Sequence, residues 1–136
     1  SAQVGIGQVN NFRSAEMYLI EAEANCHLGN KDTETQNLLI ELNRTSGRNT
    51  AYTCTKTGDE LLEEVKLYRR IELWGEGFDW FDYKRWKESI VRKSYPEGSF
   101  HVQFAVTIAP DDNNYWTWVY PAKEIDYNED ISSSVE

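Results

Sequence analysis

The residues best suited to chemistry lie in one short stretch, RIELWGEGFDWFDYKRW, which runs from Arg70 to Trp86. It sets four acids among six aromatic side chains: Glu72, Glu76, Asp79 and Asp82 among Trp74, Phe78, Trp80, Phe81, Tyr83 and Trp86. A glycosidase needs a carboxylic acid and a carboxylate across a cleft, roughly 5–10 Å apart. Acids on successive turns of a helix stand about that close, but on one wall. The stretch fits a sugar-cleaving site only if a facing wall exists.

A structural interpretation competes with the catalytic one. On a continuous helix the four acids form one row, in which neighbouring like charges repel by a few tenths of a kcal/mol. Arginines could neutralise the row, either from its flanks or from another helix, the candidates being Arg69, Arg85, Arg13 and Arg44. A bend at Gly75–Gly77 could split it. Because so short a chain hardly supplies a second wall, and His27 and His101 are uncoupled, we favour the structural interpretation and predict no catalytic site.

Composition excludes several other classes of function. The chain has 136 residues with 14 basic and 23 acidic side chains, a net charge of −9, which repels phosphate backbones and argues against nucleic-acid binding. Cys26 and Cys54 lack the spacing of a metal site, so no metal or other cofactor is predicted. The two cysteines are either unpaired thiols or a single bridge formed in an oxidising compartment.

The elements that would position these residues are mainly helical. Apolar residues recur at helical spacing over about 11–29 and again over 32–46, with Gly29 and Gly47 as stops. A link as short as this one predicts an antiparallel helical hairpin. A third helical pattern covers about 58–90, with Gly75 and Gly77 marking a bend or break.

The end of the chain changes its periodicity. Phe100–Ile108 alternates strictly, PDDNN (110–114) supplies turn residues, and Tyr115–Tyr120 alternates again. We therefore predict a β-hairpin over about 100–120. The predicted fold class is mainly α, a tetratricopeptide-like helical scaffold fragment with a C-terminal β-hairpin.

Three segments together resemble the SusD/RagB family of nutrient-binding outer-membrane lipoproteins. RSAEMYLIEAEA (13–24) resembles the family's R-x-x-E-x-Y-L-x-x-A-E-A helix, and YRRIELWGEGFDWFDYKRW (68–86) resembles its E-R-R-x-E-L-x-x-E-G segment and the continuation of it. WVYPAKEIDYN (118–128) resembles its W-x-I-P-x-x-E-I-x-x-N. The segments occur in family order, although Tyr68 stands where a Glu is usual and Asp79 where an Arg is usual.

The resemblance implies that residues 1–136 are the C-terminal portion of a longer SusD-like domain. It also implies a non-catalytic protein that binds oligosaccharide at the cell surface and passes it to a SusC-like TonB-dependent transporter. A lipid anchor outside this chain would hold it on the outer membrane. The resemblance further implies that the motif residues hold the helices of the scaffold together. They are Arg13, Glu16, Arg69, Glu72, Glu76, Asp82, Arg85 and Trp86.

Sugars bind to exposed aromatic rings that have polar groups beside them. In the second predicted strand and its turn these are Tyr115, Trp116, Trp118 and Asn113, of which Tyr115 and Trp116 lie nearest the turn and are expected to be the most exposed. The alternative for this face is packing on the helices. Acidity and abundant aromatics together fit a neutral sugar. The rival function is an intracellular tetratricopeptide-type module that holds a peptide.

Overall fold

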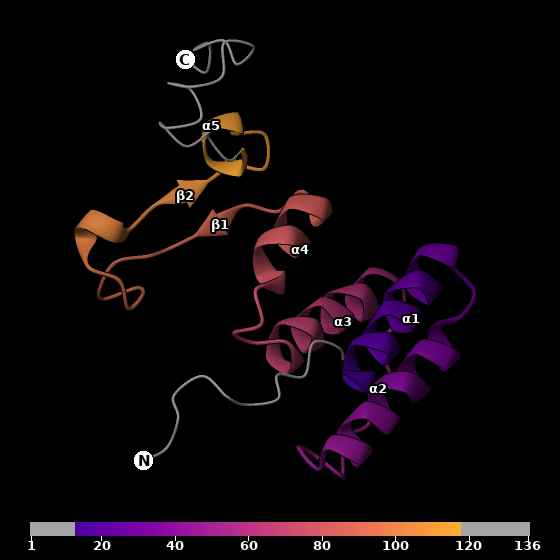
Figure 1. Cartoon of the computed structure of the whole chain (residues 1–136). Coiled ribbons are helices and arrows are strands. Elements are labelled where there is room, and N and C mark those ends of the chain that lie inside the picture. The colour runs from indigo at the N-terminus through magenta and orange to yellow at the C-terminus, as the bar shows by residue number, and fades with distance from the viewer. Residues whose placement is uncertain (1–12, 118–136) are drawn as a thin grey trace, which may run out of the picture. The chain divides into compact units, whose positions relative to one another are not determined.

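The structure is a computed structural model that describes residues 13–117. The chain divides into two compact units, residues 1–79 and residues 80–136, and each is described by itself. The first unit holds α1 (Ser14–Leu28), α2 (Asp32–Ser46) and α3 (Gly58–Glu72), while α4 (Phe78–Trp86) begins at the junction (Figure 1). Within residues 13–117 no helix has both the length and the apolar character that crossing a membrane requires.

The first unit is a helical hairpin to which a third helix is added. α1 and α2 are joined through Gly29 and Asn30, both with positive φ, and α1 packs against α2 and α3. α2 ends at Gly47, whose left-handed φ of 68° is favourable only for glycine and a few polar residues. The predicted helices over about 11–29 and 32–46 thus lie close to the observed bounds.

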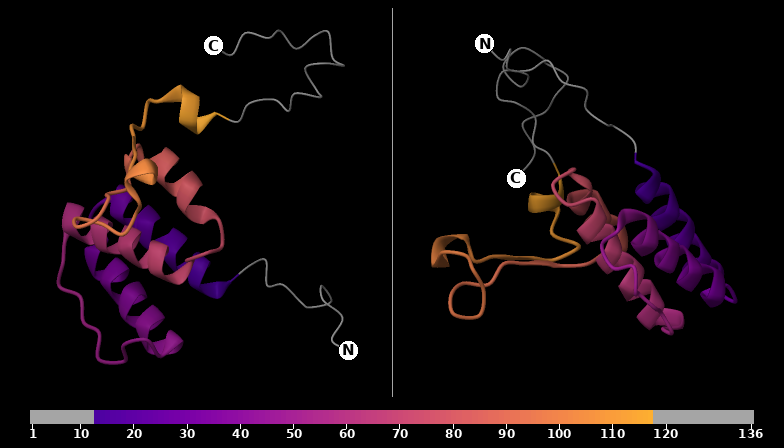
Figure 2. Two further views of the ribbon diagram at one scale, coloured as in Figure 1. Left: turned by 90° about the vertical axis from the view of Figure 1, so that its left-hand side faces the viewer. Right: turned by 90° about the horizontal axis from the view of Figure 1, so that it is seen from below.

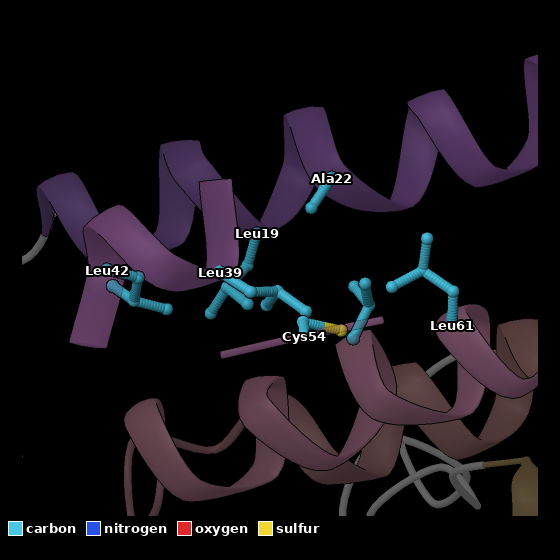
Figure 3. Packing of buried hydrophobic residues seen from close by; sticks show 7 residues of the cluster. Leu19, Ala22, Leu39, Leu42, Cys54 and Leu61 are labelled. Carbon is cyan, nitrogen blue, oxygen red and sulfur yellow. The ribbon is translucent and has the colours of Figure 1, made fainter. Parts of the chain in front are cut away.

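A single apolar cluster holds these three helices together. It consists of Leu19, Ala22, Leu39, Leu42, Cys54, Leu61 and Val65. Figure 3 shows Leu19 and Ala22 of α1 directed toward the leucines of α2 and α3. Full burial of each leucine contributes about 1.5–3 kcal/mol. Cys26 and Cys54 are free thiols, and burial raises the pKa of Cys26.

The predicted third helix is broken where the glycines indicated. α3 ends at Glu72, α4 begins at Phe78, and Gly75 and Gly77 between them have φ of 77° and 85°. Those angles suit glycine, because a side chain would clash with the backbone there. The row of acids is therefore divided: Glu72 ends α3, Glu76 lies in the turn, and Asp79 and Asp82 lie in α4.

The second unit contains the small sheet. β1 (Ile90–Val91) pairs antiparallel with β2 (Thr107–Ile108), in the register Ile90 to Ile108 and Val91 to Thr107. A short 3-10 helix, η1 (Val102–Phe104), precedes β2, and α5 (Asn113–Trp116) follows it. The prediction of a mainly α chain with a small C-terminal antiparallel hairpin is confirmed.

The predicted bounds of that hairpin were wrong. Of Phe100–Ile108 only Thr107–Ile108 forms a strand, and its partner is Ile90–Val91, at the end of and just beyond the third helix predicted over about 58–90. The His101 side chain accepts from the Gln103 N–H and begins η1, which interrupts the alternation. The N–H groups of Tyr115 and Trp116 both donate to the Asp112 carbonyl, so a helical turn forms where the second strand was expected. Residues 118–120 of that predicted strand lie outside the described range.

Candidate functional site

The carboxylate of Glu72 is the centre of an ion-pair cluster at the end of α3. Glu72 is 3% exposed, and Arg48 Nε donates to its Oε1 at 2.5 Å. Arg13 approaches from the start of α1, with its Nη2 at 3.6 Å from Glu72 Oε2, and its Nη1 donates to the Glu72 carbonyl at 2.6 Å. Arg13 Nη1 also pairs with Glu76 Oε1 at 2.5 Å.

This cluster ties three segments that are distant in the sequence. Arg13 precedes α1, Arg48 follows α2 and Glu72 ends α3, so one carboxylate fixes the ends of all three helices. A buried carboxylate is tolerated when cations and hydrogen bonds compensate for its lost hydration. The predicted arrival of Arg13 from another helix agrees with these contacts. Arg44 instead pairs with Glu41 at 2.6 Å on α2.

Sequence reasoning missed Arg48. Arg48 lies after the predicted helix over 32–46, and its contact with Glu72 spans 24 positions of the chain. The available signal was its place directly after Gly47, because a left-handed glycine turns the chain sharply at the end of a helix. Nothing in the spacing of Arg48 and Glu72 indicates that they meet.

A pocket of about 390 Å³ opens beside this cluster. Its walls come from α1, the end of α2 and the end of α3, and its lining is Arg13, Ser14, Ala15, Tyr18, Leu42, Thr45, Ser46 and Glu72. Hydroxyl groups and one arginine–glutamate pair make it mostly polar, which suits hydrogen bonding to a small polar group. Thr45 and Ser46 already donate to the Glu41 and Asn43 carbonyls of α2, at 2.8 and 3.4 Å.

A second polar network joins the α2–α3 loop to α3. Glu64 accepts from the Tyr52 hydroxyl at 2.9 Å and from Lys56 Nζ at 2.6 Å. Burial works to raise the pKa of Glu64, but the hydrogen bonds from Lys56 and Tyr52 outweigh it and leave that pKa lowered. Burial, together with hydrogen bonds to Cys54 and Glu64, raises the pKa of Tyr52.

The remaining motif residues lie in α1, α3 and α4. Arg69 is buried, with its guanidinium 5.6 Å from the centre of the Phe78 ring. In α4, Arg85 Nε donates to Asp82 at 2.8 Å, and its guanidinium lies 4.9 Å from the Trp86 ring. Glu16 lies half-buried in the first turn of α1. The contact between Asp82 and Arg85 lies within α4.

The predicted sugar-binding residues differ in how exposed they are to solvent. Trp116 is 3% exposed: its ring packs on Trp80 at a centroid distance of 4.8 Å, and its Nε1 donates to the Ala109 carbonyl. The expectation that Trp116 is solvent-exposed was wrong, because α5 turns its ring inward. Tyr115 is 52% exposed, Asn113 begins α5, and Trp118 lies outside the described range.

One comparison with known proteins decides the family. The model of the SusD family matches residues 3–134, nearly the whole chain. The chain belongs to the SusD family. Neither a curated protein nor a solved structure matches it. SusD proteins are in general non-catalytic and bind carbohydrate for nutrient uptake, and the family typically sits at the outer membrane. Membership implies glycan-binding nutrient uptake as the general role of this chain.

Proposed function

We propose that this chain is the C-terminal portion of a SusD-like domain that binds an oligosaccharide at the cell surface without cleaving it. The protein would be a surface lipoprotein that delivers the oligosaccharide to a SusC-like, TonB-dependent transporter of the outer membrane. The observation that carries the proposal is the family match over residues 3–134. A peptide-binding tetratricopeptide module does not account for that match.

The arrangement of the acids in Arg70–Trp86 supports a non-catalytic role. Glu72 is enclosed by Arg48 and Arg13, and Asp82 is bonded to Arg85. A general acid must instead reach the substrate's leaving-group oxygen, whereas the Glu72 and Asp82 side chains are only 2% and 3% exposed and face arginines. These acids are therefore better suited to holding the scaffold than to proton transfer.

For the ligand contact we propose Tyr115, with Asn113 and Trp118 near it in the sequence. Tyr115 presents an exposed ring, on which the C–H face of a sugar can stack while its hydroxyl groups exchange hydrogen bonds with water for bonds to protein. Each exchange contributes only about 1 kcal/mol net, so we expect weak binding.

The test uses the protein that carries this chain, screened on a glycan array and followed by calorimetry on each glycan that binds. We expect at least one oligosaccharide to bind, Tyr115→Ala to weaken it, and the transporter to co-purify. Trp74→Ala, an exposed aromatic of the helical unit, is the matched control. If the protein binds no plant, host or microbial glycan and no transporter co-purifies with it, the proposed function is refuted. Equal affinity in Tyr115→Ala would refute only the contact.

A further inference from the structure

The arm, which we define as residues 90–108, is a long excursion of the second unit that displays apolar side chains to solvent. β1 and β2 form its base, and η1 lies near its far end (Figures 1 and 2). Its exposed fractions reach 86% at Tyr95, 70% at Val102, 63% at Phe104 and 44% at Phe100. Large apolar groups gathered on one exposed element commonly mark a binding surface.

The backbone of the arm is organised without those side chains. Phe100 N–H donates to the Lys93 carbonyl at 3.2 Å, Tyr95 N–H to the Phe100 carbonyl at 3.4 Å, and Gly98 N–H to the Ser94 carbonyl at 2.9 Å. A Cβ on Gly98 would lie 2.2 Å from the Lys93 carbonyl oxygen, so only glycine fits there. The loop is thus closed by main-chain contacts, and its aromatic rings remain available.

The charge around the arm is opposite in sign to that of the whole chain. The arm itself carries two basic residues, Arg92 and Lys93, and one acidic residue, Glu97, a net charge of +1 in a chain of −9. On the arm itself Arg92 and Lys93 are exposed, and within residues 13–117 neither forms an ion pair. The guanidinium of Arg92 lies 5.5 Å from the centre of the Phe100 ring. A guanidinium stacked this way keeps its N–H edge for a carboxylate or sulfate.

We propose that the arm is a binding site for an acidic oligosaccharide, one that carries carboxylate or sulfate groups. Arg92 and Lys93 pair with the anionic groups, and Tyr95 and Phe100 stack on the sugar rings. This inference rests on the proposed function and names its ligand class. It replaces the neutral sugar suggested by overall composition, because the local charge at the arm, and not the total, acts on a ligand within a Debye length of about 10 Å.

The test is calorimetry of the protein that carries this chain with three probes: oligogalacturonate, the same oligomer with its carboxyl groups reduced to alcohols, and a chondroitin sulfate oligomer. We expect an acidic oligomer to bind, the reduced oligomer to bind at least about tenfold more weakly, and affinity to fall with added salt because the contacts are exposed charges. Oligogalacturonate and chondroitin sulfate distinguish carboxylate from sulfate recognition.

Variants locate the site. Arg92→Gln with Lys93→Gln should weaken binding by about five- to tenfold, and Tyr95→Ala should weaken it without altering the fold, since the Tyr95 side chain is the most exposed of the arm. Gly98→Ala should weaken binding by disturbing the loop while leaving every arm side chain except that of residue 98 unchanged. Arg44→Gln and Phe81→Ala, an exposed charge and an exposed ring elsewhere, should bind as the parent does.

Four outcomes would overturn the inference. Equal binding of the reduced and acidic oligomers would remove the role of charge, and equal affinity in the double variant and Arg44→Gln would remove the site; in both cases glycan binding itself stands. A protein partner that is lost in the double variant, with no acidic glycan bound, would show the arm to be a protein-docking element. If the protein that carries this chain binds none of the glycans tested, acidic or neutral, the proposed function is refuted as well.

Discussion

Arg48 is the residue on which the burial of Glu72 depends most. Its Nε lies within 2.5 Å of Glu72 Oε1, whereas the closest charged approach of Arg13 to the Glu72 carboxylate is 3.6 Å. Desolvation of an ion costs several kcal/mol unless a well-placed partner offsets it. Loss of Arg48 would leave that cost only partly compensated.

We predict that Arg48→Ala lowers the free energy of unfolding by about 2–4 kcal/mol, because Glu72 stays buried with its weaker partner. Arg44→Ala removes a pair with Glu41 whose arginine is 66% exposed, so its effect should stay below about 1 kcal/mol. Urea denaturation of both variants measures the difference. Equal effects would show that the Glu72 pair is no stronger than a surface pair.

The Glu64 network gives a pH dependence of definite sign. The pKa of Glu64 is lowered on folding from an ordinary 4.5, so its contribution to stability is present above about pH 4.5 and is lost as pH falls through the lower, folded pKa. We expect Glu64→Gln to destabilise the protein more at about pH 7 than at about pH 3. Thermal unfolding across that range tests this, with Glu21→Gln, an exposed acid of α1, as the control for general charge. A destabilisation independent of pH would contradict it.

Among the elements, the break between α3 and α4 depends on two glycines. Gly75 and Gly77 have open space where a Cβ would lie, so a substitution there is opposed only by the positive φ. We predict that Gly75→Ala destabilises by about 1–2 kcal/mol and Gly75→Asn by less, because asparagine tolerates the left-handed region. Chemical denaturation gives both values. An alanine that is neutral or stabilising would mean that a continuous α3–α4 helix is accessible.

The helices α1 to α4 could be predicted from the sequence and the bounds of the strands could not, for physical reasons. Leu19, Leu39 and Leu61 belong to periodic patterns that local spacing alone reveals, and Gly75–Gly77 marked the break between α3 and α4. β1 carries two apolar residues, Ile90 and Val91, too few for any period. β1 pairs with Thr107–Ile108, a segment about 17 residues away in the chain. Alternation within one segment does not predict which other segment it pairs with.

The same distinction between local patterns and distant contacts separates the site residues that the sequence predicted from those that it did not. Arg13, Glu72 and Glu76 were found because they belong to motifs, and the structure brings them together. Trp116 was misjudged because its burial depends on Trp80 and the Ala109 carbonyl, partners that no pattern around Trp116 names. The arm went unrecognised as a basic, aromatic surface, because the net charge of −9 conceals it and because Arg92, Lys93 and Tyr95 lie between the predicted helix and the predicted hairpin.

For the molecule as a whole, the central claim is that the protein holds an intact oligosaccharide and does not cleave it. The most direct measurement is native mass spectrometry of the protein that carries this chain, incubated with the oligosaccharide that binds best on the array. We predict a complex whose mass is that of the protein plus one intact oligosaccharide, unchanged over hours. Shortened oligosaccharides that disappear in Glu72→Gln or Glu76→Gln would contradict the claim by showing catalysis, and the absence of any complex would contradict binding itself.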